Sequence, residues 1–507
     1  MVDVDTEQPA SARQGWRADV CETLERLDKE IEDLCVRGTS ACGPEDLKLL
    51  ATAKDSLEGA GAAHVAARLD DVIQRIRAGD RKAATAVLQL QSSLRVFERV
   101  LTIEAMHELL AMPKSKNDED DDDDDAVVAA APKTVAPLPG NERKALVPVL
   151  EDTANAVQDL VATGLVAASA STKERLDVSF KEASRLKLGR LAASLRYTAE
   201  EIQRYLDDKN FSARRLALFA NRAWVIGRGL REAILKSDDA AMTRLLWAPS
   251  PVPVAALHVV TLGMRKRIPQ GTGIVAFDFH LRLVQPAGDL PAGARLVWSH
   301  IVPRKSGSVA ADAFLHLDVK PQNFRPLLFT EARVIAMENV MVAVDGAGGG
   351  RVLLTPQSKV KSTDAFTEWD RFRSWDRPRT LARLAAHQPS PLDLEVELAD
   401  EVVLHDAEIG DPVPRADSDV DILPLRSAGL GFDLPVARTE EGVELRAALA
   451  AMKKKASSSS SPLFGVLHFD MCRMVFTPLS ALDEKGPRHL MLSTTKVDLK
   501  ELTRSLF

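Results

Sequence analysis

The 507-residue sequence contains little cysteine, and this scarcity indicates whether the protein works in an oxidising or a reducing compartment. Its four cysteines, Cys21, Cys35, Cys42 and Cys472, are too few and too unevenly spaced to form a disulfide framework. No Cys-x-x-Cys pair occurs, which excludes a structural zinc ribbon built on such pairs. A reducing compartment is therefore expected.

Long apolar runs are also missing. No segment approaches the roughly 20 apolar residues that span a bilayer. The stretch Met1–Gln14 carries acids at Asp3, Asp5 and Glu7 and no apolar core, so it does not resemble a signal peptide. The sequence predicts a cytoplasmic protein without a membrane partner, and its richness in Ala, Arg, Leu and Val indicates a bacterial source.

The sequence does not match the common motifs that bind nucleotides or metals, nor the motif of serine hydrolases. Gly346–Gly350 lacks the Lys-Ser/Thr of a P-loop and is expected to join two strands. Asp417, Asp419 and Asp421 imitate the start of an EF-hand, but Ile422 stands where that loop needs glycine. Neither Gly-x-Ser-x-Gly nor His-x-x-x-His occurs. No cofactor and no metal site is predicted.

A strongly acidic segment divides the first half of the chain. Residues 113–140 include an unbroken acidic run, Asp118–Asp125, which alone contributes −8 to a formal net charge of −7. Like charges repel, and Pro137 and Pro139 remove backbone donors, so we expect a solvated tether rather than a packed element.

The segments on either side of this tether are expected to be helical bundles, residues 1–112 and 141–247. In the first, three helices are predicted, at about 16–36, from Pro44 toward Ile76, and at about 82–112. The second repeats parts of the first. Asp33-Leu34 corresponds to Asp159-Leu160 at an offset of 126, and Ile73-Gln74-Arg75 corresponds to Ile202-Gln203-Arg204 at an offset of 129. The interpretation is a duplicated three-helix unit, although two unrelated amphipathic segments can also be aligned in this way.

The two segments differ in charge. Ser171–Ser237 has 15 Lys and Arg against 8 Asp and Glu, whereas Gly15–Met112 has 13 against 17. Such a basic surface can attract phosphate or an acidic partner, or it can be an ordinary solvated helix face. The candidate anion-binding or partner-binding residues are Arg214, Arg215, Arg222 and Arg228.

Residues 248–507 change to the alternating pattern of strands. Val275–Leu283 shows it best, because Phe277, Phe279, Leu281 and Leu283 alternate with polar or small residues. Closely spaced strands favour a mostly antiparallel sheet with a few helices. Further strands are expected at 257–264, 295–302, 313–319, 333–344, 351–354, 392–404, 464–476 and 489–494. Helices are expected at 363–386, 440–452 and 499–507, with loops or flexible segments near 410–436 and 453–461.

The best catalytic candidates lie in this β-rich part. They are Asp278, His280, His300, His316 and Asp318. If their strands are neighbours, an Asp and a His could act as an acid–base pair. His and Asp alternating with apolar residues are also what an exposed sheet face shows.

The sequence thus predicts an α+β multidomain chain: a helical bundle region followed by a mostly antiparallel β-rich domain. The leading hypothesis is a non-enzymatic interaction or scaffold subunit of a bacterial cytoplasmic assembly, with a protein partner and the acidic tether as an electrostatic regulator. One alternative is a nucleic-acid-binding protein that uses the Arg-rich second bundle. The other is an enzyme with an acid–base site on the β-rich domain.

Overall fold

The computed structural model describes residues 10–111, 140–166, 170–207, 211–246, 251–269, 273–304, 309–344, 349–392, 398–414, 419–455, 461–470 and 473–493. The acidic run Asp118–Asp125, Cys472 and the helix expected at 499–507 lie outside these residues. The chain is α+β and multidomain, with helices first and a β-rich region after them, as the sequence predicts. Its described residues form two compact units. One holds 10–105, 140–246 and 387–392, and the other holds 106–111, 251–386, 398–414, 419–455, 461–470 and 473–493.

The first unit begins with four helices where three are expected. They are α1 (Ala10–Arg37), α2 (Pro44–Gly59), α3 (Ala63–Arg77) and α4 (Ala83–Leu110). The expected helix from Pro44 toward Ile76 is divided, because Gly61 takes a positive φ of 76° between α2 and α3. Pro44 does stand at the first turn of α2, and the Gly43 N–H donates to Asp46 at 2.8 Å.

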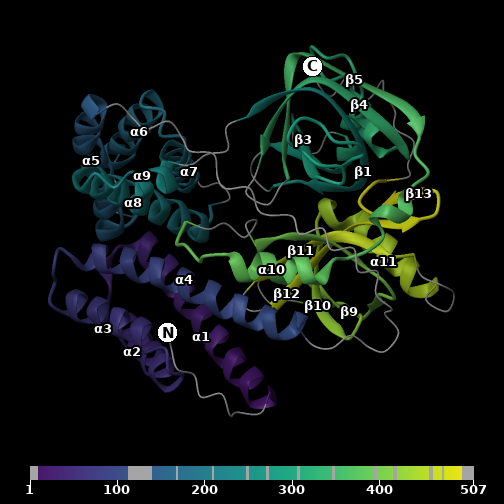
Figure 1. Ribbon diagram of the computed structural model, residues 1–507. Coiled ribbons are helices and arrows are strands. Elements are labelled where there is room, and N and C mark those ends of the chain that lie inside the picture. Colours follow the sequence, from purple (N-terminus) through teal and green to yellow (C-terminus); the bar gives the residue numbers. More distant parts are fainter. Residues whose placement is uncertain are drawn as a thin grey trace. The chain divides into compact units, whose positions relative to one another are not determined.

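Five further helices complete this unit (Figure 1). They are α5 (Gly140–Thr163), α6 (Ala170–Arg185), α7 (Gly189–Leu206), α8 (Ala213–Lys236) and α9 (Asp239–Leu246). Leu216, Ala220 and Leu230 are buried on α8, which packs against α5 and α7. None of the helices in the described residues is long and apolar enough to cross a membrane.

Some residues that are 126 or 129 positions apart, the two offsets found in the sequence, are in contact in the structure. Gly38 and Gly164 follow α1 and α5 and are 126 residues apart, and a Cβ on either would meet backbone of the other segment within 2.4 Å. The Leu165 N–H donates to the Val36 carbonyl at 2.7 Å. Ser92 of α4 and Asn221 of α8 are 129 residues apart, and the Asn221 side-chain amide donates to the Ser92 hydroxyl at 3.2 Å. Each pair therefore joins positions that the sequence comparison makes equivalent.

The second unit begins with a closed five-stranded barrel. Its strands are β1 (Val252–Arg267), β2 (Ile274–Leu283), β3 (Arg295–Pro303), β4 (Arg333–Val344) and β5 (Gly350–Ala365). They pair in the order β1-β2-β3-β5-β4, and β4 closes on β1. All pairs are antiparallel except β3 with β5. A five-stranded barrel with such crossed connections is the architecture of the OB fold.

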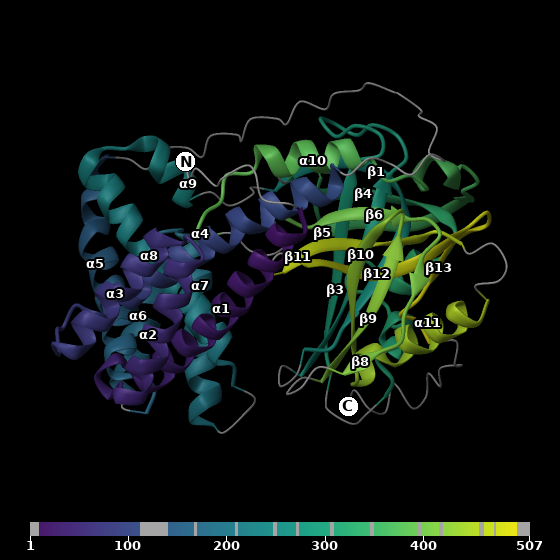
Figure 2. The same ribbon diagram turned by 90° about the horizontal axis from the view of Figure 1, so that it is seen from below.

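An eight-stranded sheet follows. Its strands are β6 (Asp400–Leu404), β7 (Glu408–Ile409), β8 (Val413–Pro414), β9 (Val420–Ser427), β10 (Leu430–Ala437), β11 (Leu463–Asp470), β12 (Arg473–Asp483) and β13 (Gly486–His489). The main order is β6-β11-β12-β10-β9-β7, with β10 and β12 parallel. Because β6 and β7 are consecutive pieces of one segment, this order repeats that of the barrel. Helix α11 (Val443–Lys455) precedes β11 and contacts β10 and β7 (Figure 2).

Five expectations for the β-rich half are wrong in detail. Residues 313–319 are not a strand: Ala311–His316 form a 3-10 helix, η2, whose Phe314 and Leu315 are buried together. The helix expected at 363–386 is interrupted. The end of β5, a short 3-10 helix η4 (Trp369–Phe372) and helix α10 (Arg377–Ala386) occupy that range.

The third concerns residues 410–436, which are not a loop. They contain β8, β9 and most of β10, and Leu430, Phe432, Leu434 and Val436 alternate into the core. Residues 464–476 belong to two strands rather than one, and β6 covers only the end of 392–404.

Candidate functional site

A buried charged cluster joins the barrel to the eight-stranded sheet. It begins on β2, where successive side chains point to opposite faces, so Asp278, His280 and Arg282 share one face. The other face carries Phe277, Phe279, Leu281 and Leu283, all fully buried. The alternation in the sequence therefore places three charged or titratable groups side by side on the outside of the barrel.

Glu401 of β6 binds two of these groups. One of its carboxylate oxygens lies 2.6 Å from His280 Nδ1, and the other accepts a hydrogen bond from Arg282. The Glu401 side chain is only 10% exposed. Burial by itself raises the pKa of this carboxyl. Arg282 and His280 lower the pKa by more than burial raises it, so it lies well below its ordinary value. Glu401 is therefore a permanent anion held between two strands of different modules.

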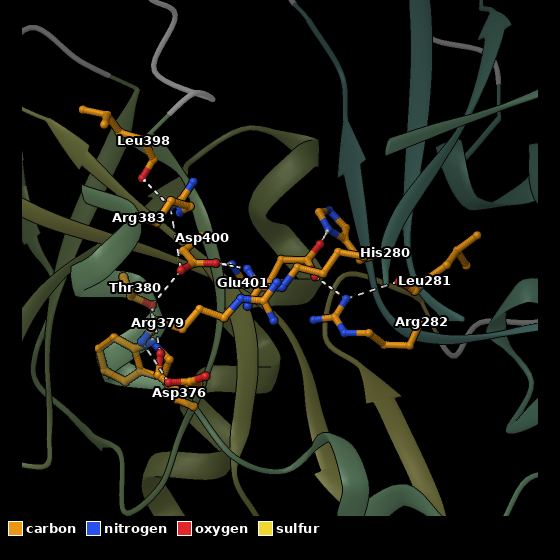
Figure 3. A network of polar contacts seen from close by, with 12 residues as sticks. His280, Leu281, Arg282, Asp376, Arg379, Thr380, Arg383, Leu398, Asp400 and Glu401 are labelled. Atoms are coloured by element: carbon orange, nitrogen blue, oxygen red, sulfur yellow. Dashed lines mark hydrogen bonds and ion pairs between the residues drawn. The ribbon is translucent and has the colours of Figure 1, made fainter. Parts of the chain in front are cut away.

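Asp400 extends the cluster to α10 (Figure 3). One of its oxygens accepts from Arg295 of β3, and the other accepts from the Thr380 hydroxyl at 2.7 Å. Arg383 lies 3.7 Å from that second oxygen. Burial and the neighbouring Arg282 lower the pKa of Arg295 to about 10, which leaves it protonated at neutral pH. Two adjacent acids thus hold arginines from β2, β3 and α10.

A second ionic junction lies at the C-terminal end of β1. Lys266 is 1% exposed, and its ammonium lies 2.7 Å from Glu444 of α11 and 3.1 Å from Asp312 of η2. Glu441 accepts from the Ile268 N–H at 2.7 Å. A buried ammonium with two carboxylates is strongly favoured over one without them.

Charge segregation along the chain explains both junctions. Residues 249–386 hold 18 Lys and Arg against 11 Asp and Glu, whereas residues 395–507 hold 13 against 19. The first set is therefore basic and the second acidic. Four of the described ion pairs join a cation of residues 249–386 to an acid of residues 395–507: Lys266–Glu444, Arg282–Glu401, Arg295–Asp400 and Arg304–Glu440. This complementarity helps to hold the two β modules together.

The structure separates the five acid–base candidates. Asp278 lies two residues from His280, on the same face of β2. It is bound by Arg267 at 2.7 Å and by the Ser299 hydroxyl at 2.6 Å. His300 pairs with Phe277 in the β2–β3 register, so it lies on the opposite face, where it stacks on Phe277 and Trp298. Burial lowers the pKa of His300 to about 4.

The other two candidates lie between β3 and β4. His316 ends η2, and Asp318 lies 3.7 Å from Arg325 and 3.9 Å from Lys320. His280 is thus paired with Glu401, which the sequence had not suggested. Asp278 lies beside it but is bound by Arg267 and Ser299, and His300, His316 and Asp318 do not converge on it.

The four arginine candidates of α8 occupy different settings. Arg222 is 6% exposed and donates to the Leu392 carbonyl. Arg215 lies 3.1 Å from the buried Glu201, and Arg228 lies over the Trp224 ring at 5.5 Å. Arg214 is close enough to Glu32 to influence its carboxyl, whose pKa burial raises to about 7.

Sequence reasoning missed Asp400 and Glu401. The only local signal is a pair of adjacent acids directly before the apolar residues Val402, Val403 and Leu404. An acid at the start of a buried strand requires a cationic partner. Nothing local indicates that the partners are more than 100 residues earlier. In the described part of the chain, no group of three or more His, Cys, Asp or Glu side chains could hold a metal ion.

Comparisons with known proteins give no family. No family model and no curated protein matches the chain. Several solved structures are similar to parts of it, and three of them each cover 45% of its length. One, described as "Molecular basis for abrogation of activation of pro-inflammatory cytokines", is covered over 92%, at a TM-score of 0.20 and 8% identity. "Structural mimicry for functional antagonism" is covered over 92%, at 0.22 and 7%. "Crystal structure of Ifi202 HINa domain in complex with 20bp dsDNA" is covered over 91%, at 0.20 and 8%. Scores of this size support no argument about function.

Proposed function

We propose that the chain is a non-enzymatic interaction or scaffold subunit of a bacterial cytoplasmic protein assembly. The observation that carries this proposal is that the His280 side chain is already bound to the carboxylate of Glu401. Its Nδ1 lies 2.6 Å from Glu401, whose other oxygen is bound by Arg282. A general base needs an accessible nitrogen beside a substrate. A histidine buried between two modules and fixed by a hydrogen-bonded carboxylate is better suited to holding a platform rigid.

The arrangement of the β modules supports the same function. Two ionic junctions and a close approach of β1 to β11 and β12 hold the barrel and the sheet as one body. A rigid body with both modules fixed presents a constant surface to a partner, which reduces the ordering cost of association.

The helical unit adds a second binding element. We propose that it arose by duplication, because Gly38 meets Gly164 and Ser92 meets Asn221, each position contacting its own counterpart. Self-contact of this kind is what a two-fold interface requires. Duplicated helical bundles offer two related faces to partners.

Native co-purification tests the proposed function. The full-length tagged chain would be isolated from its own cells, and co-purifying proteins would be quantified by mass spectrometry. The proposal predicts at least one partner in fixed stoichiometry that rebinds when both proteins are purified. Failure to recover a partner, together with turnover that is abolished by His280→Ala, would favour the enzyme alternative.

A nucleic-acid partner is the second candidate. The OB architecture of the barrel hosts many oligonucleotide-binding proteins, which is an argument by analogy of fold. Binding through α8 would require Arg214 and Arg228, since Arg222 is buried. An Arg214→Gln, Arg228→Gln variant should then lose affinity and salt dependence in mobility-shift assays with single-stranded and double-stranded probes. No shift by the intact protein at low salt excludes this candidate.

The regulatory role of the acidic tether stays a prediction from the sequence. Replacing Asp118–Asp125 with Ser and Gly should change the salt sensitivity of partner binding if the run competes with an acidic partner. Unchanged salt sensitivity would reject that role.

A further inference from the structure

The two halves of the helical unit, α1 to α4 and α5 to α8, contact each other in a reciprocal pattern. The Leu165 N–H donates to the Val36 carbonyl at 2.7 Å, and the Ser40 hydroxyl donates to the Ala162 carbonyl at 2.8 Å. Val36 and Ala162 are equivalent at the offset of 126. Each half therefore donates a hydrogen bond to the same position of the other half, as in a two-fold interface.

The residues at the centre of this pattern are equivalent in position but differ in size. Ser92 and Asn221 are equivalent at the offset of 129 and contact each other, as residues beside a two-fold axis do. Asn221 is fully buried, and its side-chain amide donates to the Ser92 hydroxyl at 3.2 Å and to the Leu88 carbonyl at 2.8 Å. Two asparagines would overfill this position, and two serines would leave a gap. The contact therefore suits one residue from each half.

A second contact across the interface differs between its two equivalent copies. The Thr85 hydroxyl of α4 donates to the Gln158 side-chain carbonyl of α5 at 2.5 Å. The equivalent residues are Arg214 of α8, at the offset of 129, and Glu32 of α1, at the offset of 126. α1 packs against α8; burial raises the pKa of Glu32 to about 7, while Arg214 acts to lower it. One copy of the contact is thus neutral, and the other brings opposite charges together.

Pairing of like halves would lose the second of these matches. In a pair of first halves Glu32 would meet Thr85, and in a pair of second halves Arg214 would meet Gln158. Only unlike halves bring Arg214 to Glu32 while Gln158 keeps Thr85. Charges placed in this way select a partner mainly by penalising the wrong one.

We propose that the contacts Ser92–Asn221 and Glu32–Arg214 make this interface selective for unlike halves, so that each chain pairs its own two halves and excludes those of a second copy. A duplicated unit needs such selectivity, because related halves can otherwise exchange between chains. The inference rests on the duplication proposed above but requires no partner protein. Its test uses the purified chain alone, so its failure is distinguishable from failure of the assembly function.

Exchange of the two central residues tests the first contact in the full-length protein. Asn221→Ser removes a buried hydrogen bond and Ser92→Asn overfills the position, so each should lower the melting temperature by roughly 5 °C. Both should also speed amide hydrogen exchange in α4 and α8. The two substitutions together restore one asparagine and one serine, and should recover most of the loss. Additive losses in the exchanged variant would overturn the proposal.

Light scattering of the purified chain tests the selectivity. Asn221→Ser combined with Arg214→Glu gives serine at the centre of every pairing and brings like charges together only when unlike halves pair. This variant should self-associate, with its mass rising toward twice that of the intact protein as its concentration increases. Adding Glu32→Arg restores opposite charges and should return the mass of the intact protein.

Asn221→Ser combined with Arg185→Glu is the matched control. Arg185 of α6 is exposed and pairs with Glu182 at 2.8 Å, so this variant changes the net charge equally but leaves the Glu32–Arg214 contact in place. It should keep the mass of the intact protein. Self-association of this control, or an unchanged mass of the Arg214→Glu variant, contradicts selection by the Glu32–Arg214 contact.

Discussion

Glu401 joins the two β modules through both of its carboxylate oxygens. Its two oxygens hold His280 and Arg282 from one strand of the barrel. Removing one partner of a buried ion pair leaves the remaining charges without compensation, and this usually costs about 3–5 kcal/mol. Glu401→Gln should therefore lower the free energy of unfolding of the second unit by about that amount, as measured by urea denaturation.

A surface carboxylate provides the control for that measurement. Glu338 lies 3.6 Å from Lys361, and both side chains are exposed to solvent. Exposed pairs contribute at most about 1 kcal/mol. If Glu338→Gln and Glu401→Gln were equally destabilising, the buried cluster would have no special role.

Two partly buried histidines, His300 and His489, make the second unit sensitive to acid. Burial lowers the pKa of His300 and of His489 to about 4, from an ordinary value of 6.5. Below pH 6.5 the unfolded chain takes up protons that the folded chain refuses, so stability falls as the pH drops from 6.5 toward 4. Between pH 6.5 and pH 5 the loss should be about 1.5 kcal/mol for each histidine.

His300→Phe separates this effect from packing, because phenylalanine keeps the stack on Phe277 and Trp298. Chemical denaturation at several pH values should show a shallower acid slope in this variant. An unchanged slope between pH 6.5 and pH 5 would contradict the assignment to His300.

At the scale of elements, the strands with one buried face could be predicted. Phe277, Phe279, Leu281 and Leu283 alternate with polar residues, and β2 lies within one residue of the expected range. The segment 313–319 was misassigned because a 3-10 helix can also bury apolar residues at short spacing, and Phe314 and Leu315 are both buried.

The site was less predictable than the strands. His280 could be selected from its pattern, but its partner Glu401 is 121 residues away. No local periodicity relates two residues at that distance, since the pairing depends on how β2 and β6 approach each other in the folded chain. Arg222 shows the same limitation: its position on α8 is regular, yet its contact is with the Leu392 carbonyl.

β1 approaches β11 and β12 closely at one glycine. A Cβ on Gly263 would meet the Leu479 Cβ at 2.6 Å and the Phe464 ring at 2.8 Å. Overpacking of a filled core typically costs about 1–3 kcal/mol. Gly263→Ala should lower the melting temperature of the second unit, whereas Gly431→Ala in β10 should not, because nothing lies within 4 Å of its Cβ position. Equal effects would show that β1 is not held against the sheet.

At the scale of the whole molecule, opposite charges are divided between consecutive parts of the chain. Lys266, Arg282 and Arg295 of residues 249–386 form ion pairs with acids of residues 395–507. Of the titratable groups that first suggested catalysis, His280 takes part in this internal contact, through Glu401. The second unit is then a rigid platform of two β modules, and the first unit is a helical bundle. Both are features expected of the proposed interaction subunit.

The most direct test is the mass of the protein as it exists in its own cells. Native purification followed by size-exclusion chromatography with light scattering should give a complex larger than the chain alone. Its mass should equal that of a whole number of 55.2 kDa chains plus the mass of a stoichiometric partner. A monodisperse species of 55.2 kDa without any co-purifying protein would contradict the proposed function.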